Sequence, residues 1–248
     1  MSESTSALHA DLGDRSLRGS GRRFYVYLSL LMWLLALVGF GPGYISALVD
    51  GTWARSLPIH VHAFVYVGWL ALFTYQVSLP SAGQIATHKR LGKALVVYAV
   101  LMVVVGLTVT FSRFAERVAA DELVAAQHAL IHPLSDMVIF PVLFGLAVYF
   151  RATPEVHKRL MVVATTFLLV AAVGRMSFLG NPPSTLVYDL VWLSPIWIAM
   201  ARDAFVSRRV HPVYAISMVT LGLVPLRTAI VETPPYQHFT VWLATWVG

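Results

Sequence analysis

Histidine is the residue type in this sequence best suited to carry chemistry. The chain has nine histidines and no cysteine among its 248 residues. Without cysteine it cannot form disulfides, thiolate-bound iron–sulfur clusters or cysteine-ligated zinc sites. Imidazole and carboxylate groups are therefore the side chains that we expect to bind any metal or cofactor.

The composition indicates the environment in which these histidines lie. The chain is 58% hydrophobic and 12% charged, with a mean hydropathy of +0.71, whereas soluble domains are about one quarter charged. The net charge of +6 comes from short clusters between apolar runs, a pattern of membrane topology rather than of nucleic-acid binding. We expect an all-α polytopic membrane helix bundle, with the lipid bilayer as its partner and no nucleic acid.

Seven apolar runs are long enough to cross a bilayer, which requires about 20 residues each. They cover residues 24–48, 60–80, 94–111, 124–150, 160–179, 185–201 and 213–231. Pro42 with its neighbouring glycines predicts a kink or an early end of the first span, and Pro133 predicts a fresh helix start within the fourth. The expected organisation is a polar and basic tail (1–23), a seven-helix domain (24–231) and an outer carboxyl-terminal segment (232–248).

The basic residues predict the orientation of the chain. If the amino terminus is cytoplasmic, thirteen of the 18 lysines and arginines lie on the cytoplasmic side, as positive-inside topology requires. Seven spans then place the carboxyl terminus outside. We expect a multipass protein of the inner, cytoplasmic membrane.

A tetrapeptide recurs at equivalent places in two helix pairs. His-Lys-Arg-Leu occurs at residues 88–91 and again at 157–160. His62 precedes the first copy by 26 residues, and His132 precedes the second by 25. Spans two and three therefore read as a parallel internal repeat of spans four and five, and such repeats place functional sites at the interface between the copies.

Four charged residues are expected at one depth in the membrane. At about 1.5 Å per residue, all four lie roughly 18–22 Å from the cytoplasmic ends of their spans. They are Asp136, Arg175, Asp189 and Arg227. Two acids and two bases at one depth predict a buried layer of paired charges, and His62 and His132 fall about one turn above it. The alternative is a purely structural ion-pair layer with histidines at the membrane interface.

The spacing of the outer histidines also allows a metal site. His128, His132 and Asp136 share one helical face at four-residue intervals. Together with His60 and His62 they form a ligand set that would suit zinc, copper or iron.

Two families resemble the chain at these residues. The strings HVHAFVYVGWLALF, HKRLG, HPLSDMVIFPVLFGLAVYFR and HKRLM, within residues 58–179, resemble a group of functionally uncharacterised bacterial multipass membrane proteins. One histidine on each of four successive helices, alternately outer and inner, resembles the diheme transmembrane cytochrome b proteins.

The second resemblance implies two b-type haems. His62 and His132 would ligate an outer haem, and His88 and His157 an inner one. The basic pairs that follow the inner histidines would contact haem propionates: Lys89, Arg90, Lys158 and Arg159. The chain departs from that family because His88 and His157 stand at the cytoplasmic edge, about 39 Å from the outer pair. Alternatively, each His-Lys-Arg-Leu binds lipid headgroups.

Three function classes follow. The first is b-type haem-dependent membrane electron transfer at an outward-facing histidine and acid site, with at least one haem held by His62 and His132 and a quinone or another small lipophilic substrate. The second is a non-haem metal enzyme using the outer histidines, whose site resembles that of seven-helix hydrolases of the adiponectin-receptor and ceramidase type, although their serine motif is missing here. The third is a transporter or lipid-binding scaffold without a cofactor. If the chain is an enzyme, it would be a membrane oxidoreductase or a metal-dependent hydrolase.

Overall fold

The computed structural model describes residues 2–52, 57–179 and 185–247, with side chains from residue 23 onward. All regular structure in this part of the chain is helical, which confirms the all-α prediction. The α-helices are α1 (Ser2–Val49), α2 (Leu57–Ser81), α3 (Ile85–Ala119), α4 (Leu123–Tyr149), α5 (Pro154–Leu168), α6 (Val170–Val173), α7 (Thr185–Trp192), α8 (Ser194–Ser207), α9 (Pro212–Gly222) and α10 (Pro234–Val247). The short 3-10 helices are η1 (Phe150–Ala152), η2 (Ser177–Leu179) and η3 (Val224–Glu232).

Six helical segments of the described chain are long and apolar enough to cross a membrane. They are Arg23–Val49, Leu57–Ser81, Ile85–Ala119, Leu123–Ala152, Pro154–Val173 and Pro212–Glu232. A seventh crossing is formed if α7 and α8, which meet at a bend of 68°, count as one broken span. The chain is therefore a multipass helical membrane protein, with the predicted seven spans if the bent pair is one.

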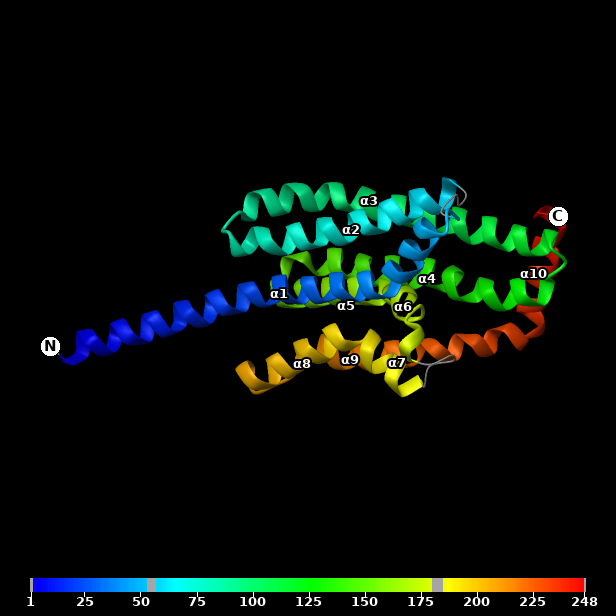
Figure 1. The fold of residues 1–248 in the computed structure, drawn as a ribbon. Coiled ribbons are helices and arrows are strands. Elements are labelled where there is room, and N and C mark those ends of the chain that lie inside the picture. Colours follow the sequence, from blue (N-terminus) through cyan, green and yellow to red (C-terminus); the bar gives the residue numbers. More distant parts are fainter. Residues whose placement is uncertain (1, 53–56, 180–184, 248) are drawn as a thin grey trace.

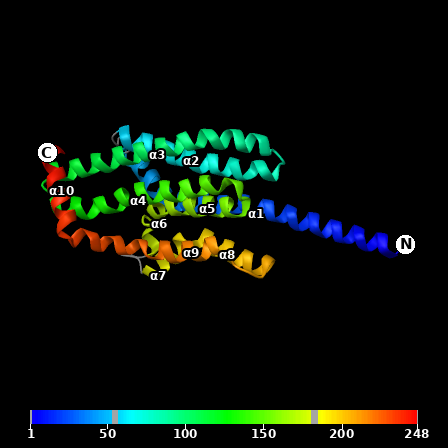
Figure 2. The same ribbon diagram turned by 180° about the vertical axis from the view of Figure 1, so that it is seen from behind.

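The helices form an elongated bundle (Figure 1). Helices α2 and α3 make one antiparallel hairpin and α4 and α5 make another, and both hairpins turn at the same end of the bundle, which we call the inner end. Seen from behind in Figure 2, α10 lies across the opposite, outer end, where it contacts α3 and α4. The two termini lie at opposite ends.

Prolines alter the spans less than the sequence predicts. Helix α1 continues through Pro42 to Val49, and its last part turns away from the rest of the helix in Figure 1. Helix α4 runs unbroken through Pro133 and Pro141, so the predicted fresh start at Pro133 is wrong. The Ser135 hydroxyl donates to the Ile131 and His132 carbonyls (2.7 and 2.9 Å) within the turn that contains this proline.

Two later spans are broken where continuous runs were expected. Helix α5 ends at Leu168 and is followed by the single turn of α6 and then η2. The last span begins as α9 and continues as η3. These irregular segments, α6 and η3, contribute Arg175 at the end of α6 and Arg227 within η3 to the outer half of the bundle.

Candidate functional site

The two histidines of the repeated tetrapeptide meet at the inner end. His88 is the fourth residue of α3 and His157 the fourth of α5. Their ring centres are 6.3 Å apart and their planes are inclined by 79°. The structure thus brings together the predicted inner pair at the interface between the two hairpins.

Each of these rings is held by a main-chain carbonyl of the preceding helix. Nδ1 of His88 is 3.1 Å from the Gln76 oxygen, and Nδ1 of His157 is 2.7 Å from the Ala147 oxygen. Since a carbonyl only accepts hydrogen bonds, Nδ1 is the donor in both rings, and in the neutral form of each ring Nε2 is then the nitrogen with the lone pair. The Gln76 side chain also donates to the His88 carbonyl (3.3 Å). This is the arrangement found behind metal-bound histidines, where the second nitrogen is fixed by a backbone acceptor.

The basic residues beside the two histidines differ between the copies. Lys89 and Arg90 are exposed. Arg159 is buried and makes a double hydrogen bond with Asp203 of α8, from Nε to Oδ2 (3.0 Å) and from Nη2 to Oδ1 (2.9 Å). Arg159 was predicted to contact a haem propionate or a lipid headgroup, but its guanidinium is bonded to Asp203 instead.

Asp203 was not predicted from the sequence as a functional residue. Its side chain is only 2% exposed. The sequence feature that could have indicated it is a single acidic residue directly after Arg202, in a segment whose arginines were assigned to the cytoplasmic side. Its burial depends on which helix packs beside α5, and the spacing of residues along the sequence does not specify that neighbour.

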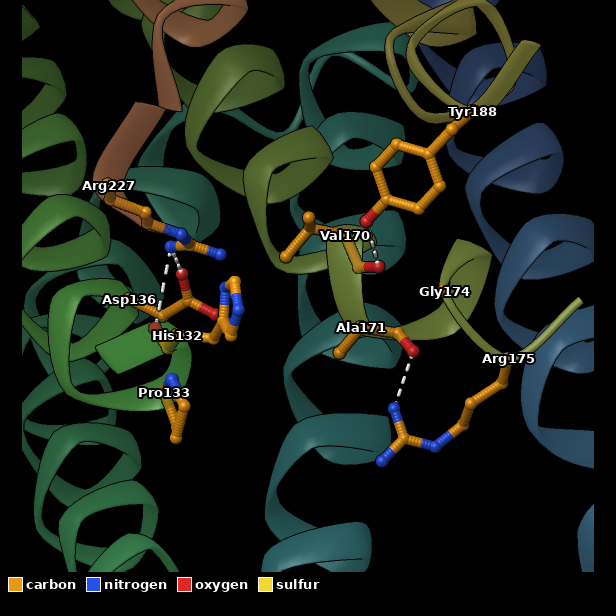
Figure 3. Close-up of a pocket in the computed structure, with 9 residues that line it drawn as sticks. All are labelled: His132, Pro133, Asp136, Val170, Ala171, Gly174, Arg175, Tyr188 and Arg227. Atoms are coloured by element: carbon orange, nitrogen blue, oxygen red, sulfur yellow. Dashed lines mark hydrogen bonds and ion pairs between the residues drawn. The ribbon is translucent and has the colours of Figure 1, made fainter. Parts of the chain in front are cut away.

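A pocket of about 350 Å³ opens at the outer half of the bundle. Figure 3 shows its lining, which comes from α4, from α6 and the turn after it, from α7 and from η3. The lining residues are His132, Pro133, Asp136, Val170, Ala171, Gly174, Arg175, Tyr188 and Arg227. Three of the four residues of the predicted charge layer, together with one predicted histidine ligand, lie in this pocket.

An ion pair between Asp136 and Arg227 joins α4 to η3 on one wall of the pocket. The two side chains are 17% and 10% exposed, respectively. Nη1 of Arg227 also donates to the Ser135 hydroxyl (2.8 Å) and to the His132 carbonyl (3.4 Å). Of the four charges predicted at a common depth, these two form an ion pair.

Tyr188, which was not predicted from the sequence, also lines the pocket. Tyr188 donates to the Val170 carbonyl (2.9 Å) and lies within electrostatic range of all four charges. Arg175 is exposed rather than buried as expected; it donates to the Ala171 carbonyl (2.5 Å) and lies over the Phe40 ring at 4.9 Å. Asp189 is half-buried, with one buried carboxylate oxygen that has no hydrogen-bond partner.

The outer histidines differ in their neighbours and in their exposure. His62 stacks on Tyr66 with ring centres 4.1 Å apart, and its Nδ1 is buried without a hydrogen-bond partner. His132 is exposed at the pocket, His128 is exposed with its Nε2 3.7 Å from Glu232, and His60 is half-buried.

No group of three or more His, Cys, Asp or Glu side chains that could hold a metal ion occurs in the described part of the chain. The predicted non-haem site at His60, His62, His128, His132 and Asp136 stays a prediction.

Comparison with known proteins gives no relative from which a function could be transferred. No protein-family model matches the chain, and no curated protein or solved structure is significantly similar to it.

Proposed function

We propose that this membrane protein transfers electrons and binds a b-type haem at its inner end, between His88 and His157. The observation that carries the proposal is the paired arrangement of the two rings, each fixed through Nδ1 by a main-chain carbonyl and separated by 6.3 Å. Both Nε2 atoms are thereby left as acceptors, the form in which imidazole binds iron.

The ring separation fits two imidazoles on one iron. Metal–nitrogen distances of about 2 Å on each side place the centres of two such rings roughly 6 Å apart. Haem brings four nitrogens of its own and takes two ligands from the chain, whereas a bare zinc or copper ion takes three or four. A pair of histidines from two hairpins therefore suits haem better than a bare metal ion.

The chain would position the cofactor and tune its chemistry. When bound, haem supplies a one-electron redox couple. Two histidine ligands leave the iron no open position, which favours electron transfer over gas binding. The carbonyls of Gln76 and Ala147 hold the rings and make them better ligands, and the exposed Lys89 and Arg90 are placed for the propionates.

The outer pair, His62 and His132, has less support as a second haem site. The ring that His62 contacts is that of Tyr66, and His132 lies in the outer pocket beside Arg227. We also propose that the inner end faces the cytoplasm, because it collects most of the basic residues. The carboxyl terminus then lies outside the inner membrane, and a quinone or another small lipophilic molecule in the bilayer is the proposed electron-transfer partner.

The test is a reduced-minus-oxidised absorption spectrum of the full chain, purified in mild detergent from haem-sufficient cells. We expect the bands of a six-coordinate b-type haem at one haem per chain. His88→Ala and His157→Ala should each abolish them, while His62→Ala and His132→Ala should retain them.

His238→Ala is the matched control, since His238 is an exposed histidine on α10. Folded chain that stays colourless after reconstitution with haemin would overturn the proposal. Stoichiometric zinc or copper in elemental analysis, without haem, would instead support the metal-enzyme alternative.

A further inference from the structure

Helix α10 begins where the last membrane span ends. That span, Pro212–Glu232, has 21 residues, and about 20 residues are enough to cross the hydrocarbon core of a bilayer. Only Thr233 separates it from Pro234, the first residue of α10. Figure 2 shows α10 lying across the outer end of the bundle rather than along it. The length of the span and the direction of the helix therefore place α10 at the level of the outer lipid headgroups.

One side of α10 is fixed to the protein. Tyr236 and Thr240 are buried. The Tyr236 hydroxyl donates to the Gln127 carbonyl of α4 (2.8 Å), and the Gln127 side chain donates in turn to the Thr240 hydroxyl (2.7 Å). Further along the same side, α10 packs on apolar residues of α3 and α4 through Leu243, Ala244 and Val247. The other sides of the helix are thereby held in a defined direction.

A second side of α10 carries three exposed aromatic residues. Phe239, Trp242 and Trp246 are spaced by three and four residues, so they share one face of the helix. They are 38%, 56% and 73% exposed, respectively. The ring centres of Phe239 and Trp242 are 6.2 Å apart, and those of Trp242 and Trp246 are 6.0 Å apart. The three rings thus form one continuous apolar surface, which we call the aromatic stripe.

The remaining side of α10 is more polar. His238 and Thr245 are exposed and seven residues apart, so they share a face that is separate from the aromatic stripe. The sequence of α10 contains no Lys, Arg, Asp or Glu, so no full charge has to leave water where this helix meets lipid. A helix with one apolar and one polar exposed side suits the boundary between water and hydrocarbon.

We propose that α10 binds the outer leaflet of the bilayer that the chain spans, with the aromatic stripe inserted between the headgroups and the acyl chains. Tryptophan prefers this depth because its ring is apolar and its N–H reaches the headgroup region. The preceding segment η3 already exposes Leu226 and Ile230, which lipid covers in a membrane protein, so the same occupant extends onto α10. The proposal does not depend on the haem at the inner end.

Single nitroxide labels measure the depth of each side of α10. The chain contains no cysteine, so one introduced cysteine gives one labelled site without further substitutions. Trp242→Cys and Trp246→Cys label the aromatic stripe, and Thr245→Cys is the matched control on the polar side. Val97→Cys is the lipid reference, since Val97 is 72% exposed within the span of α3. The full chain is reconstituted in phosphatidylcholine vesicles, and electron paramagnetic resonance records collisions with oxygen, which concentrates in hydrocarbon, and with a water-soluble nickel chelate.

We expect the labels at positions 242 and 246 to lie about 5–10 Å deeper than the label at position 245, the depth to which the apolar side of an interfacial helix is buried. Oxygen collisions should dominate at the two stripe positions, as at position 97, and nickel-chelate collisions at position 245. Positions 245 and 246 are neighbours on one backbone. A helix that had unfolded or left the membrane would therefore give them equal values, whereas the proposal requires a difference.

Two outcomes contradict the proposal. Frequent nickel-chelate collisions at positions 242, 245 and 246 alike would show that α10 is surrounded by water. Infrequent collisions with both reagents at positions 242 and 246 would show that protein, such as a second copy of the chain, covers the aromatic stripe instead of lipid. Elution of each labelled variant at the volume of the wild type in size-exclusion chromatography confirms that the assayed chain is folded.

Discussion

The two copies of His-Lys-Arg-Leu have equivalent histidines and very different arginines. His88 and His157 occupy the same position in their helices and bond the same kind of main-chain acceptor. Arg90 is exposed, whereas Arg159 is buried, bonded to Asp203 and stacked 5.6 Å from the Tyr214 ring centre. The histidine contacts lie within each hairpin, so they repeat with it. Arg159 bonds Glu155 of its own helix (2.6 Å), but its contacts with Asp203 and Tyr214 depend on helices outside the hairpin, so these do not repeat.

The surroundings of α3 and α5 explain the difference. One third of the most apolar stretch of α3 is buried inside the protein, compared with two thirds for the span formed by α5 and α6. Helices α8 and α9 pack on α5, and α1 packs on α6. The first copy therefore stands at the edge of the bundle and the second at its centre, and the same tetrapeptide serves a different purpose in each.

Removing the arginine of each copy should expose this difference most strongly. Arg159→Ala removes the double hydrogen bond to the buried Asp203 and leaves it only the longer contact with Arg202 at 4.0 Å; breaking a buried ion pair typically costs about 3–5 kcal/mol of folding free energy. Arg90→Ala removes an exposed side chain and should stay within about 0.5 kcal/mol of the wild type. Unfolding in a denaturing-detergent titration measures both, and equal losses would show that the two copies are energetically equivalent.

A smaller effect is expected from filling the glycine contacts around each copy. A Cβ on Gly39 of α1 would lie 2.2 Å from the Ala172 carbonyl oxygen of α6, a main-chain atom that cannot rotate away. Gly39→Ala should therefore cost about 1–3 kcal/mol. A Cβ on Gly92 of α3 meets only the Gln76 amide, at 3.7 Å, and Gly92→Ala should be neutral or slightly stabilising. The denaturing-detergent titration measures the unfolding free energy of both variants. An unchanged unfolding free energy in Gly39→Ala would mean that α1 can move away from α6.

Replacing the whole ion pair of the second copy should cost little. Arg159→Met combined with Asp203→Leu removes both buried charges together, and such exchanges are often neutral or stabilising. We expect the double variant to be more stable than Arg159→Ala and close to the wild type. A double variant as unstable as Arg159→Ala would show that packing around Arg159, rather than its charge, stabilises this region.

The smallest predicted difference is a pH dependence near the second copy. Burial, and then the nearby Arg159, lower the pKa of His211 from its usual value near 6.5. The neutral His211 ring caps α9 by accepting the Val213 N–H at 3.2 Å. The folded chain thus binds fewer protons than the unfolded one, so this contribution is present above about pH 6.5 and is lost as the pH falls below it. Between about pH 7.5 and about pH 5.5 the melting temperature should change less in His211→Asn than in the wild type, because asparagine can cap the helix but does not titrate. An equal change in both proteins would show that another group causes the pH dependence.

The sequence was sufficient to predict features that depend on distance along one helix. A fixed rise per residue converts position into depth, and this is why Asp136 and Arg227 were expected in one layer although they lie 91 residues apart; which acid pairs with which base was not predicted. The same reasoning placed His88 and His157 at one level. These predictions needed only the span ends, which the apolar runs define.

Features that depend on which helices are neighbours could not be predicted in this way. Arg159 was assigned to the membrane surface because it lies in a basic cluster, yet α8 brings Asp203 beside it. Tyr188 entered the outer pocket because α7 and α8 meet at a bend. Pro133 lies inside α4 without ending it, which the sequence rule for a fresh helix start at proline did not predict.

The ion pair between Asp136 and Arg227 also bears on how the chain enters the membrane during synthesis. An arginine at the centre of an isolated helix makes insertion less favourable by about 2.5–3.5 kcal/mol, and one between the centre and the end of a span, as Arg227 is, by less. The span of α9 and η3 carries this arginine, and its partner belongs to α4, which the ribosome completes much earlier. The span of α9 and η3 therefore enters the membrane by packing on helices that are already in the bilayer. Its insertion depends on the correct placement of those helices, α4 above all.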